Sequence, residues 1–136
     1  MTDLIDSWRQ TVRAVRLDPG HDPHLVEVEP LEIFSVFGRP ADSIVRHLNL
    51  GADAIMGTDV HTSGAFAVPT ASYPKNDAAT RLLALTGTVV EGFAIVGSVI
   101  ILGTDADGRI TDTPPHIEES LRRLGYRVSS EVRNAP

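Results

Sequence analysis

Among the residues whose types could support catalysis, the five histidines are scattered along the chain, and the serine considered with them is Ser98. His61 lies in a loop rich in threonine, serine and glycine, a kind of segment that often carries function. One hypothesis is therefore a small hydrolase or nucleotide-modifying enzyme that uses His61 together with an acid. No G-x-S-x-G motif accompanies His61, and Ser98 falls in an apolar run expected to be a buried strand, so a serine triad is not predicted. His21 and His24 flank a proline and are interpreted as exposed loop residues.

The densest group of possible metal ligands lies late in the chain and consists of Asp105, Asp107, Asp112 and His116. A calcium loop needs acids at its first, third and fifth positions and glycine at its sixth, whereas here Gly108 directly follows Asp107. We interpret the segment as a hairpin turn followed by a helix cap. No metal site is predicted. No glycine-rich phosphate-binding loop occurs either, and no cofactor is predicted.

The segment Ser72-Tyr73-Pro74-Lys75-Asn76 leads into a predicted helix and offers two interpretations. Backbone amides and Lys75 could bind an anion at the helix N-terminus. Alternatively, Asn76 only caps the helix. The candidate binding residues are therefore Asn76, Tyr73 and His61, and no catalytic residue is assigned.

The elements expected to position these residues begin with a short helix over residues 3–9. A strand over residues 11–17 follows, and the Asp18-Pro19-Gly20 turn returns the chain into a strand over residues 25–28, which together form a hairpin. Pro40 suits a helix start, and the pattern predicts a short helix that ends at Asn49 or Gly51.

Further strands are expected over residues 52–56 and 66–68, before a helix with Asn76 or Asp77 as its N-cap. A last helix is predicted from about Thr113 to Gly125, followed by a possible strand over residues 126–128 and a loose tail over residues 129–136.

The apolar run over residues 89–102 is rich in β-branched residues and is interpreted as one or two buried strands. It is shorter than the roughly 20 apolar residues that cross a bilayer, and Glu91 interrupts it. Strands and helices without strict alternation predict an α+β fold, with a mainly antiparallel sheet and two to four short helices packed on it. Residues 1–128 are expected to form a single domain.

Composition narrows the functional classes. The 136 residues include no cysteine, and their formal net charge is −6. An acidic chain is not expected to bind the phosphate backbone of nucleic acids. An acidic DNA-mimic inhibitor is an alternative, and it predicts that Asp42, Asp53, Asp59 and Asp77 are spaced along one face. No signal peptide or membrane segment is recognised, so a cytoplasmic protein is expected.

A family resemblance rests on the residues around the apolar run. They are Pro74-x-Asn76-x-x-Ala79-Thr80 and Glu91-Gly92-x-x-Ile95-x-Gly97-x-x-Ile100-Ile101-Leu102-Gly103-x-Asp105-x-x-Gly108. The opening hairpin, Val12-x-x-Val15-x-Leu17-Asp18-Pro19-Gly20, is also similar. On these residues the chain resembles domain of unknown function 3846, a family of small proteins from bacteriophages, plasmids and actinobacterial genomes with no established activity.

The resemblance and the missing catalytic motifs together favour a non-enzymatic accessory protein of phage or mobile-element origin. Such a protein would act by binding a host protein or a small ligand. Within the family resemblance, Asn76 is the polar residue expected to matter most. The residues indicate no particular oligomeric state.

Overall fold

The structure of the protein, a computed structural model, describes residues 10–29, 46–49, 53–58, 66–67, 70, 74–86, 94–107 and 109–134. The predicted helix over residues 3–9 lies outside these described residues. So do most of the residues predicted to form a helix between Pro40 and Asn49.

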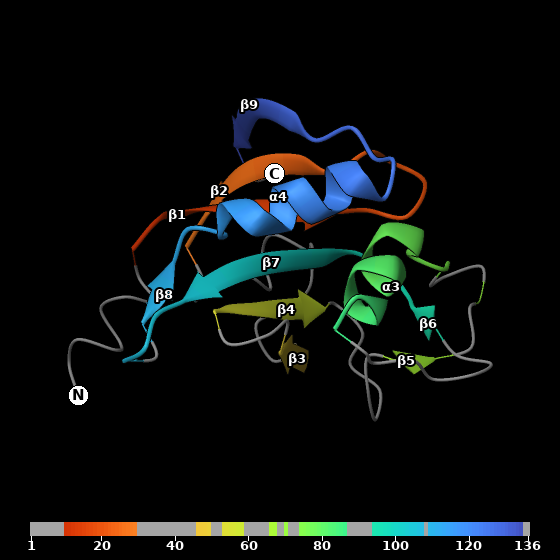
Figure 1. The fold of residues 1–136 in the computed structure, drawn as a ribbon, viewed down its shortest axis with the longest axis horizontal. Helices are drawn as coiled ribbons and strands as arrows, with labels where there is room; N and C mark the ends of the chain where they lie inside the picture. Colours follow the sequence, from red (N-terminus) through yellow and green to blue (C-terminus); the bar gives the residue numbers. More distant parts are fainter. Residues whose placement is uncertain are drawn as a thin grey trace.

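The centre of the fold is a sheet built around the predicted hairpin (Figure 1). Strands β1 (Val12–Leu17) and β2 (His24–Val28) pair antiparallel, and β7 (Val99–Thr104) pairs with the other side of β1. The sheet order is β3-β4-β7-β1-β2-β9, with β8 also paired to β7. The remaining strands of this sheet are β3 (Arg46–Asn49), β4 (Ala54–Thr58), β8 (Ile110–Thr111) and β9 (Ser129–Asn134). Strands β5 (Phe66–Ala67) and β6 (Ala94–Ile95) form a separate antiparallel pair.

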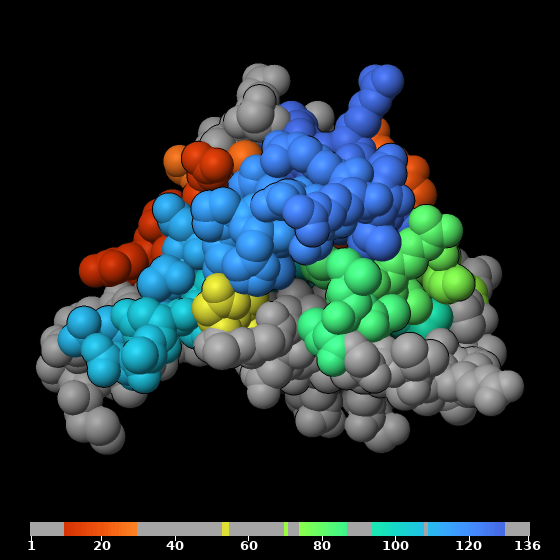
Figure 2. All heavy atoms as spheres, viewed as in Figure 1, coloured from red at the N-terminus to blue at the C-terminus, as the bar shows by residue number. Residues whose placement is uncertain are grey.

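Two helices are described, and both lie against one face of the sheet. They are α3 (Asp77–Ala84) and α4 (Pro115–Arg123). A single apolar cluster joins them to the inward side chains of β1 and β7, such as Val15, Leu17 and Ile101. Figure 1 shows α4 lying across the sheet with α3 at one end of β7, and Figure 2 shows their surfaces meeting on the outside of this face.

The opposite face of the sheet is also buried. Its side chains alternate along the strands with those that face the helices, because successive residues of a strand point to opposite sides. They form a second apolar cluster of Val12, Ala14, Val26, Val28, Ile100, Leu102 and Ile110. Burial on both faces explains why the run over β7 is apolar throughout and shows no alternation.

Thr113 bridges β1 and β7 by hydrogen bonds at the point where the two strands stop pairing with each other. Its backbone N–H donates to the carbonyl of Arg13 at 2.9 Å, and its hydroxyl donates to the carbonyl of Ile101 at 2.5 Å while it accepts from the N–H of Val15 at 3.1 Å. The neighbouring Asp112 carboxylate accepts from the N–H of Arg13 at 2.8 Å. We call this contact set the Thr113 junction. Thr113 is 7% exposed, and its hydroxyl is fully used within the sheet.

The α+β class is confirmed, and every described strand pairing is antiparallel except that of β2 with β9. Two local predictions are wrong. Residues 46–49 were expected to end a helix but form β3, because they pair residue by residue with β4. The expected tail instead contains β9, which pairs parallel with β2. In both places the local sequence has only a weak preference for one secondary structure, and pairing with a distant strand determines that the segment is a strand.

The helix predicted from about Thr113 to Gly125 is confirmed as α4, which begins at Pro115, and the helix ends before Gly125 as expected. Gly125 has a φ of 95°, and the N–H groups of Gly125 and Tyr126 donate to the carbonyls of Arg122 and Leu121. This pair of bonds is a Schellman motif, and it turns the chain out of the helix at once. Residues 126–128 therefore form no strand. Among the described residues, no helix is long and apolar enough to span a bilayer.

Candidate functional site

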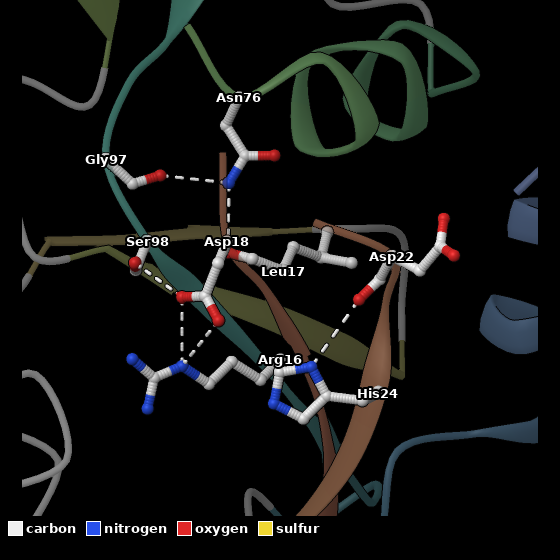
Figure 3. Close-up of polar contacts among 8 residues, drawn as sticks. All are labelled: Arg16, Leu17, Asp18, Asp22, His24, Asn76, Gly97 and Ser98. Atoms are coloured by element: carbon white, nitrogen blue, oxygen red, sulfur yellow. Dashed lines mark hydrogen bonds and ion pairs between the residues drawn. The ribbon is translucent and has the colours of Figure 1, made fainter. Parts of the chain in front are cut away.

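Asn76 stands where β1, α3 and the segment between β6 and β7 meet (Figure 3). Its side-chain oxygen accepts from the N–H of Ala79 at 3.1 Å, which confirms Asn76 as the N-cap of α3. Its side-chain nitrogen donates to the carbonyls of Leu17 at 3.0 Å and Gly97 at 2.9 Å. We call these contacts the Asn76 junction. Asn76 is only 1% exposed, and both of its amide hydrogens are already bonded within the protein.

The turn that follows β1 places an ionised carboxylate beside this junction. The N–H of His21 donates to the carbonyl of Asp18 at 3.1 Å, and Gly20 has a φ of 77°, as a type II turn with Pro19 before the glycine requires. The Asp18 carboxylate accepts from the Ser98 hydroxyl at 2.6 Å and from Arg16 Nε at 3.0 Å.

Burial alone would raise the pKa of the Asp18 carboxyl, because it disfavours the charged form. The hydrogen bonds from Ser98 and Arg16, with the charges of Arg16 and His24, outweigh burial and hold this pKa below its usual value of 3.8. Asp18 is therefore a fixed anion and not a proton donor at neutral pH. The Ser98 hydroxyl donates to Asp18, but a carboxyl whose pKa is held below its usual value is too weak a base to take the serine proton at neutral pH.

A hollow of about 230 Å³ opens beside this network, and it is the candidate site. Its lining comes from the turn after β1, from the start of α3 and from Tyr126, the last residue of the Schellman motif that ends α4. The lining residues are Asp18, Gly20, His21, Asp22, Asn76, Asp77, Ala78 and Tyr126. Three of the lining residues, Asp18, Asp22 and Asp77, carry carboxylates, and none of the lining residues is a lysine or arginine.

Tyr126 provides the aromatic wall of the hollow, and the Schellman motif sets its place. Its side chain is half-buried against the helix-side core. The guanidinium carbon of Arg81 lies 6.0 Å from the centroid of the Tyr126 ring. This distance is that of a cation–π contact, so the Tyr126 ring already receives one cation of the protein itself.

The three carboxylates of the hollow differ in their partners. Asp18 is paired with Arg16, and Asp77 lies 3.3 Å from Lys75 in an exposed ion pair. The Asp22 carboxylate has neither a hydrogen bond nor an ion pair within the described chain, and Figure 3 shows it pointing away from the Asp18 network. Asp22 is thus the lining carboxylate with an uncompensated charge.

Other groups singled out in the sequence lie away from the hollow. One Asp105 oxygen accepts from the N–H groups of Asp107 and Arg109, which confirms the predicted turn. His116 Nε2 lies 2.9 Å from an Asp53 oxygen at the surface between α4 and β4. Within the parts of the chain that the structure describes, no three histidine or acidic residues are grouped closely enough to hold a metal ion.

The sequence prediction found one lining residue of the hollow and missed most of the others. Asn76 lies in the hollow, whereas Tyr73 and His61 lie outside the described residues. Asp42 and Asp59, on which the DNA-mimic hypothesis depends, also lie outside them. The sequence analysis assigns Asp18 to a turn, His21 to an exposed loop and Tyr126 to a strand, and it does not single out Asp22. Only the tertiary fold brings the first turn next to the residue that follows α4.

Comparison of the chain with protein-family models, with curated proteins and with solved structures finds no match to any of them.

Proposed function

We propose that this protein is a non-enzymatic binding protein that holds a small, positively charged group in the hollow beside the Asn76 junction. The observation that carries the proposal is a concave site lined by a tyrosine ring and three carboxylates, of which Asp18 and Asp77 are paired with Arg16 and Lys75 from outside the lining and Asp22 is not paired. Clefts lined by one sign of charge concentrate ligands of the opposite sign.

The size of the hollow restricts the ligand. Its volume of about 230 Å³ is below the roughly 300–1,000 Å³ of sites for drug-sized molecules. A primary or quaternary ammonium group with a short carbon chain suits such a space. Asp22 supplies the uncompensated charge, Asp18 is kept ionised by its own partners, and the Tyr126 ring is a surface on which cations are attracted.

An accessory role in a phage or mobile element, in the cytoplasm of a bacterium, is part of this proposal and rests only on the sequence motifs by which the chain resembles domain of unknown function 3846, since no family model matches the chain. Binding and not turnover is favoured because the groups near the hollow are held by other residues. The Ser98 hydroxyl donates to Asp18, and the Asn76 amide bonds two backbone carbonyls.

The proposal is tested by calorimetric and NMR titration of the full chain with 1,4-diaminobutane and with tetramethylammonium. The uncharged 1,4-butanediol serves as the matched control ligand. The amines are expected to bind and to shift the backbone signals of residues 18–22 and 126, whereas the diol is not. Equal binding of the diol, or no binding of either amine, contradicts the proposal.

A matched pair of variants separates a site effect from a general effect of charge. Asp22→Asn removes the uncompensated carboxylate of the hollow, and Glu27→Gln removes an exposed carboxylate from β2. One unit charge at about 4 Å is worth about 1 kcal/mol in water, so Asp22→Asn is expected to weaken amine binding roughly fivefold. Glu27→Gln is expected to leave binding unchanged. An equal loss in both variants contradicts a specific site.

A further inference from the structure

We propose that the ligand of the hollow is a small zwitterion, a linear amino acid whose ammonium group lies at Asp22 and whose carboxylate is bound by Arg81. This inference rests on the proposed binding of a cationic group and names the class of the ligand. It starts from two opposite charges beside the hollow, Asp22 and Arg81. Within the described residues, neither of their side chains has an ion-pair partner.

The position of Arg81 on α3 brings its charge to the hollow. Arg81 follows the lining residues Asp77 and Ala78 by four and three residues, and such residues share one face of a helix. Its guanidinium carbon lies 6.0 Å from the centroid of the ring of Tyr126, which is itself a lining residue. Arg81 is not in the lining, so its charge adjoins the hollow at Tyr126 from outside.

The Arg81 guanidinium is available to a ligand. Arg81 is exposed, and its side chain makes no hydrogen bond or ion pair within the part of the chain that the structure describes. Asp77 stands at the spacing of a helical ion pair with Arg81, but its carboxylate pairs with Lys75 at 3.3 Å. A cation–π contact does not neutralise a guanidinium, whose forked N–H groups can bind a carboxylate through two parallel hydrogen bonds.

The same arginine makes a ligand of purely positive charge an incomplete match. The Tyr126 ring already receives the Arg81 guanidinium, and a second cation at this ring is repelled by the first. A carboxylate on the same ligand compensates Arg81, while the ammonium group compensates Asp22. A zwitterion therefore uses both charges, whereas a simple amine uses one and meets repulsion from the other.

The two charges of the ligand are predicted to be separated by a short carbon chain. Asp22 belongs to the turn after β1, whereas Arg81 adjoins the hollow from α3 at Tyr126. The hollow of about 230 Å³ offers Ala78 and the Tyr126 ring as apolar contacts for methylene groups. An α-amino acid carries both charges on one carbon atom, so a linear ω-amino acid suits this arrangement better.

Calorimetric titration of the full chain with three matched ligands tests the inference. The probes are 4-aminobutanoate, butylamine, which lacks the carboxylate, and butanoate, which lacks the ammonium group. Opposite unit charges at about 4 Å in water favour binding about fivefold, so 4-aminobutanoate is expected to bind about fivefold more tightly than butylamine. Butanoate is expected to bind more weakly than either.

Variants at two arginines locate the carboxylate. Arg81→Gln removes the charge at the hollow, and Arg127→Gln is the matched control, because it removes an exposed arginine next to Tyr126 in the sequence. In Arg81→Gln the two amines are expected to bind equally, whereas Arg127→Gln retains their difference. Arg81→Glu is expected to reverse the difference, because a glutamate repels the carboxylate of the ligand. Binding of butylamine shows that each variant is folded.

The outcomes separate this inference from the proposed function. Equal affinities of the wild type for 4-aminobutanoate and butylamine overturn the zwitterion and leave the binding of a cation standing. If neither binds, both proposals are contradicted. A difference that persists in Arg81→Gln, or that disappears in Arg127→Gln, overturns the assigned carboxylate contact. Tighter binding of glycine than of 4-aminobutanoate overturns the predicted separation of the charges.

Discussion

The Asn76 junction and the Thr113 junction are two places where a buried polar side chain replaces hydrogen bonds that the sheet does not supply. The Thr113 hydroxyl accepts from the N–H of Val15 in the middle of β1 and donates to the carbonyl of Ile101 in β7. The Asn76 amide donates to the carbonyl of Leu17 at the end of β1. The Thr113 junction is closed, and its groups are used within the sheet. The Asn76 junction borders a hollow and the uncompensated carboxylate of Asp22. The comparison teaches that a buried, fully bonded polar group maintains the fold, while a neighbouring unpaired one is available for a ligand.

The largest expected effect is that of Asn76→Ala. It removes the helix cap and leaves the carbonyls of Leu17 and Gly97 without their donor, which together cost about 4 kcal/mol in the free energy of unfolding. Urea denaturation measures the loss. Asn76→Asp keeps a capping oxygen but lacks the two donors, so it is expected to be destabilised as well. If the free energy of unfolding of Asn76→Asp equals that of the wild type, Asn76 acts only as the helix cap and its two amide hydrogen bonds do not contribute to stability.

Gly103→Ala tests how tightly β7 packs against β8 and Asp112, next to the Thr113 junction. A Cβ at Gly103 would overlap the carbonyl oxygen of Asp112 and the hydroxyl of Thr111, and the oxygen of Asp112 belongs to the backbone and cannot rotate away. Such overpacking is expected to cost about 3 kcal/mol. Gly125→Ala is the matched control, since a Cβ there meets open space and only the positive φ costs about 1 kcal/mol. Thermal unfolding in which both variants lose equal stability would contradict tight packing at Gly103.

Thr113→Val removes the hydroxyl of the Thr113 junction and keeps the shape of the side chain nearly constant. The variant leaves the Val15 N–H and the Ile101 carbonyl without the hydroxyl, and it is expected to lose about 2 kcal/mol. Thr113→Ser keeps the hydroxyl and is expected to lose less. Denaturant titrations that find the serine variant weaker than the valine variant would show that packing, and not hydrogen bonding, holds this junction.

The smallest expected effect is a pH dependence confined to the hollow. The pKa of Asp18 is lower in the folded protein than in the unfolded chain, so the unfolded state takes up the proton first. The contribution of Asp18 to stability is therefore complete above about pH 4 and is lost as the pH falls below 3.8 through the folded pKa. As the pH is lowered through this range, the free energy of unfolding is expected to fall more steeply in the wild type than in Asp18→Asn. Parallel curves would contradict the assigned network.

Much of the fold could be read from local patterns, and the reasons are local. The 18–21 turn needs proline and glycine in successive positions, the α3 cap needs a side chain such as Asn76, and the end of α4 needs a residue that accepts positive φ. The apolar run fixes β7 because both of its faces are buried. In contrast, β3 and β9 carry mixed polar segments, and their strand state depends on partners far along the chain.

The candidate site shows the same division. Asn76 could be found because its capping position is a local signal. Asp22 and Tyr126 could not, because their importance depends on lying around one hollow although they are distant in sequence. The sequence by itself determined the apolar interior, the turns, the helix ends and the α+β class, since these depend on hydrophobic burial and on backbone torsions within a few residues. The tertiary structure decided which carboxylates are neutralised and which is left unpaired, because electrostatic compensation depends on distances that only the folded chain sets.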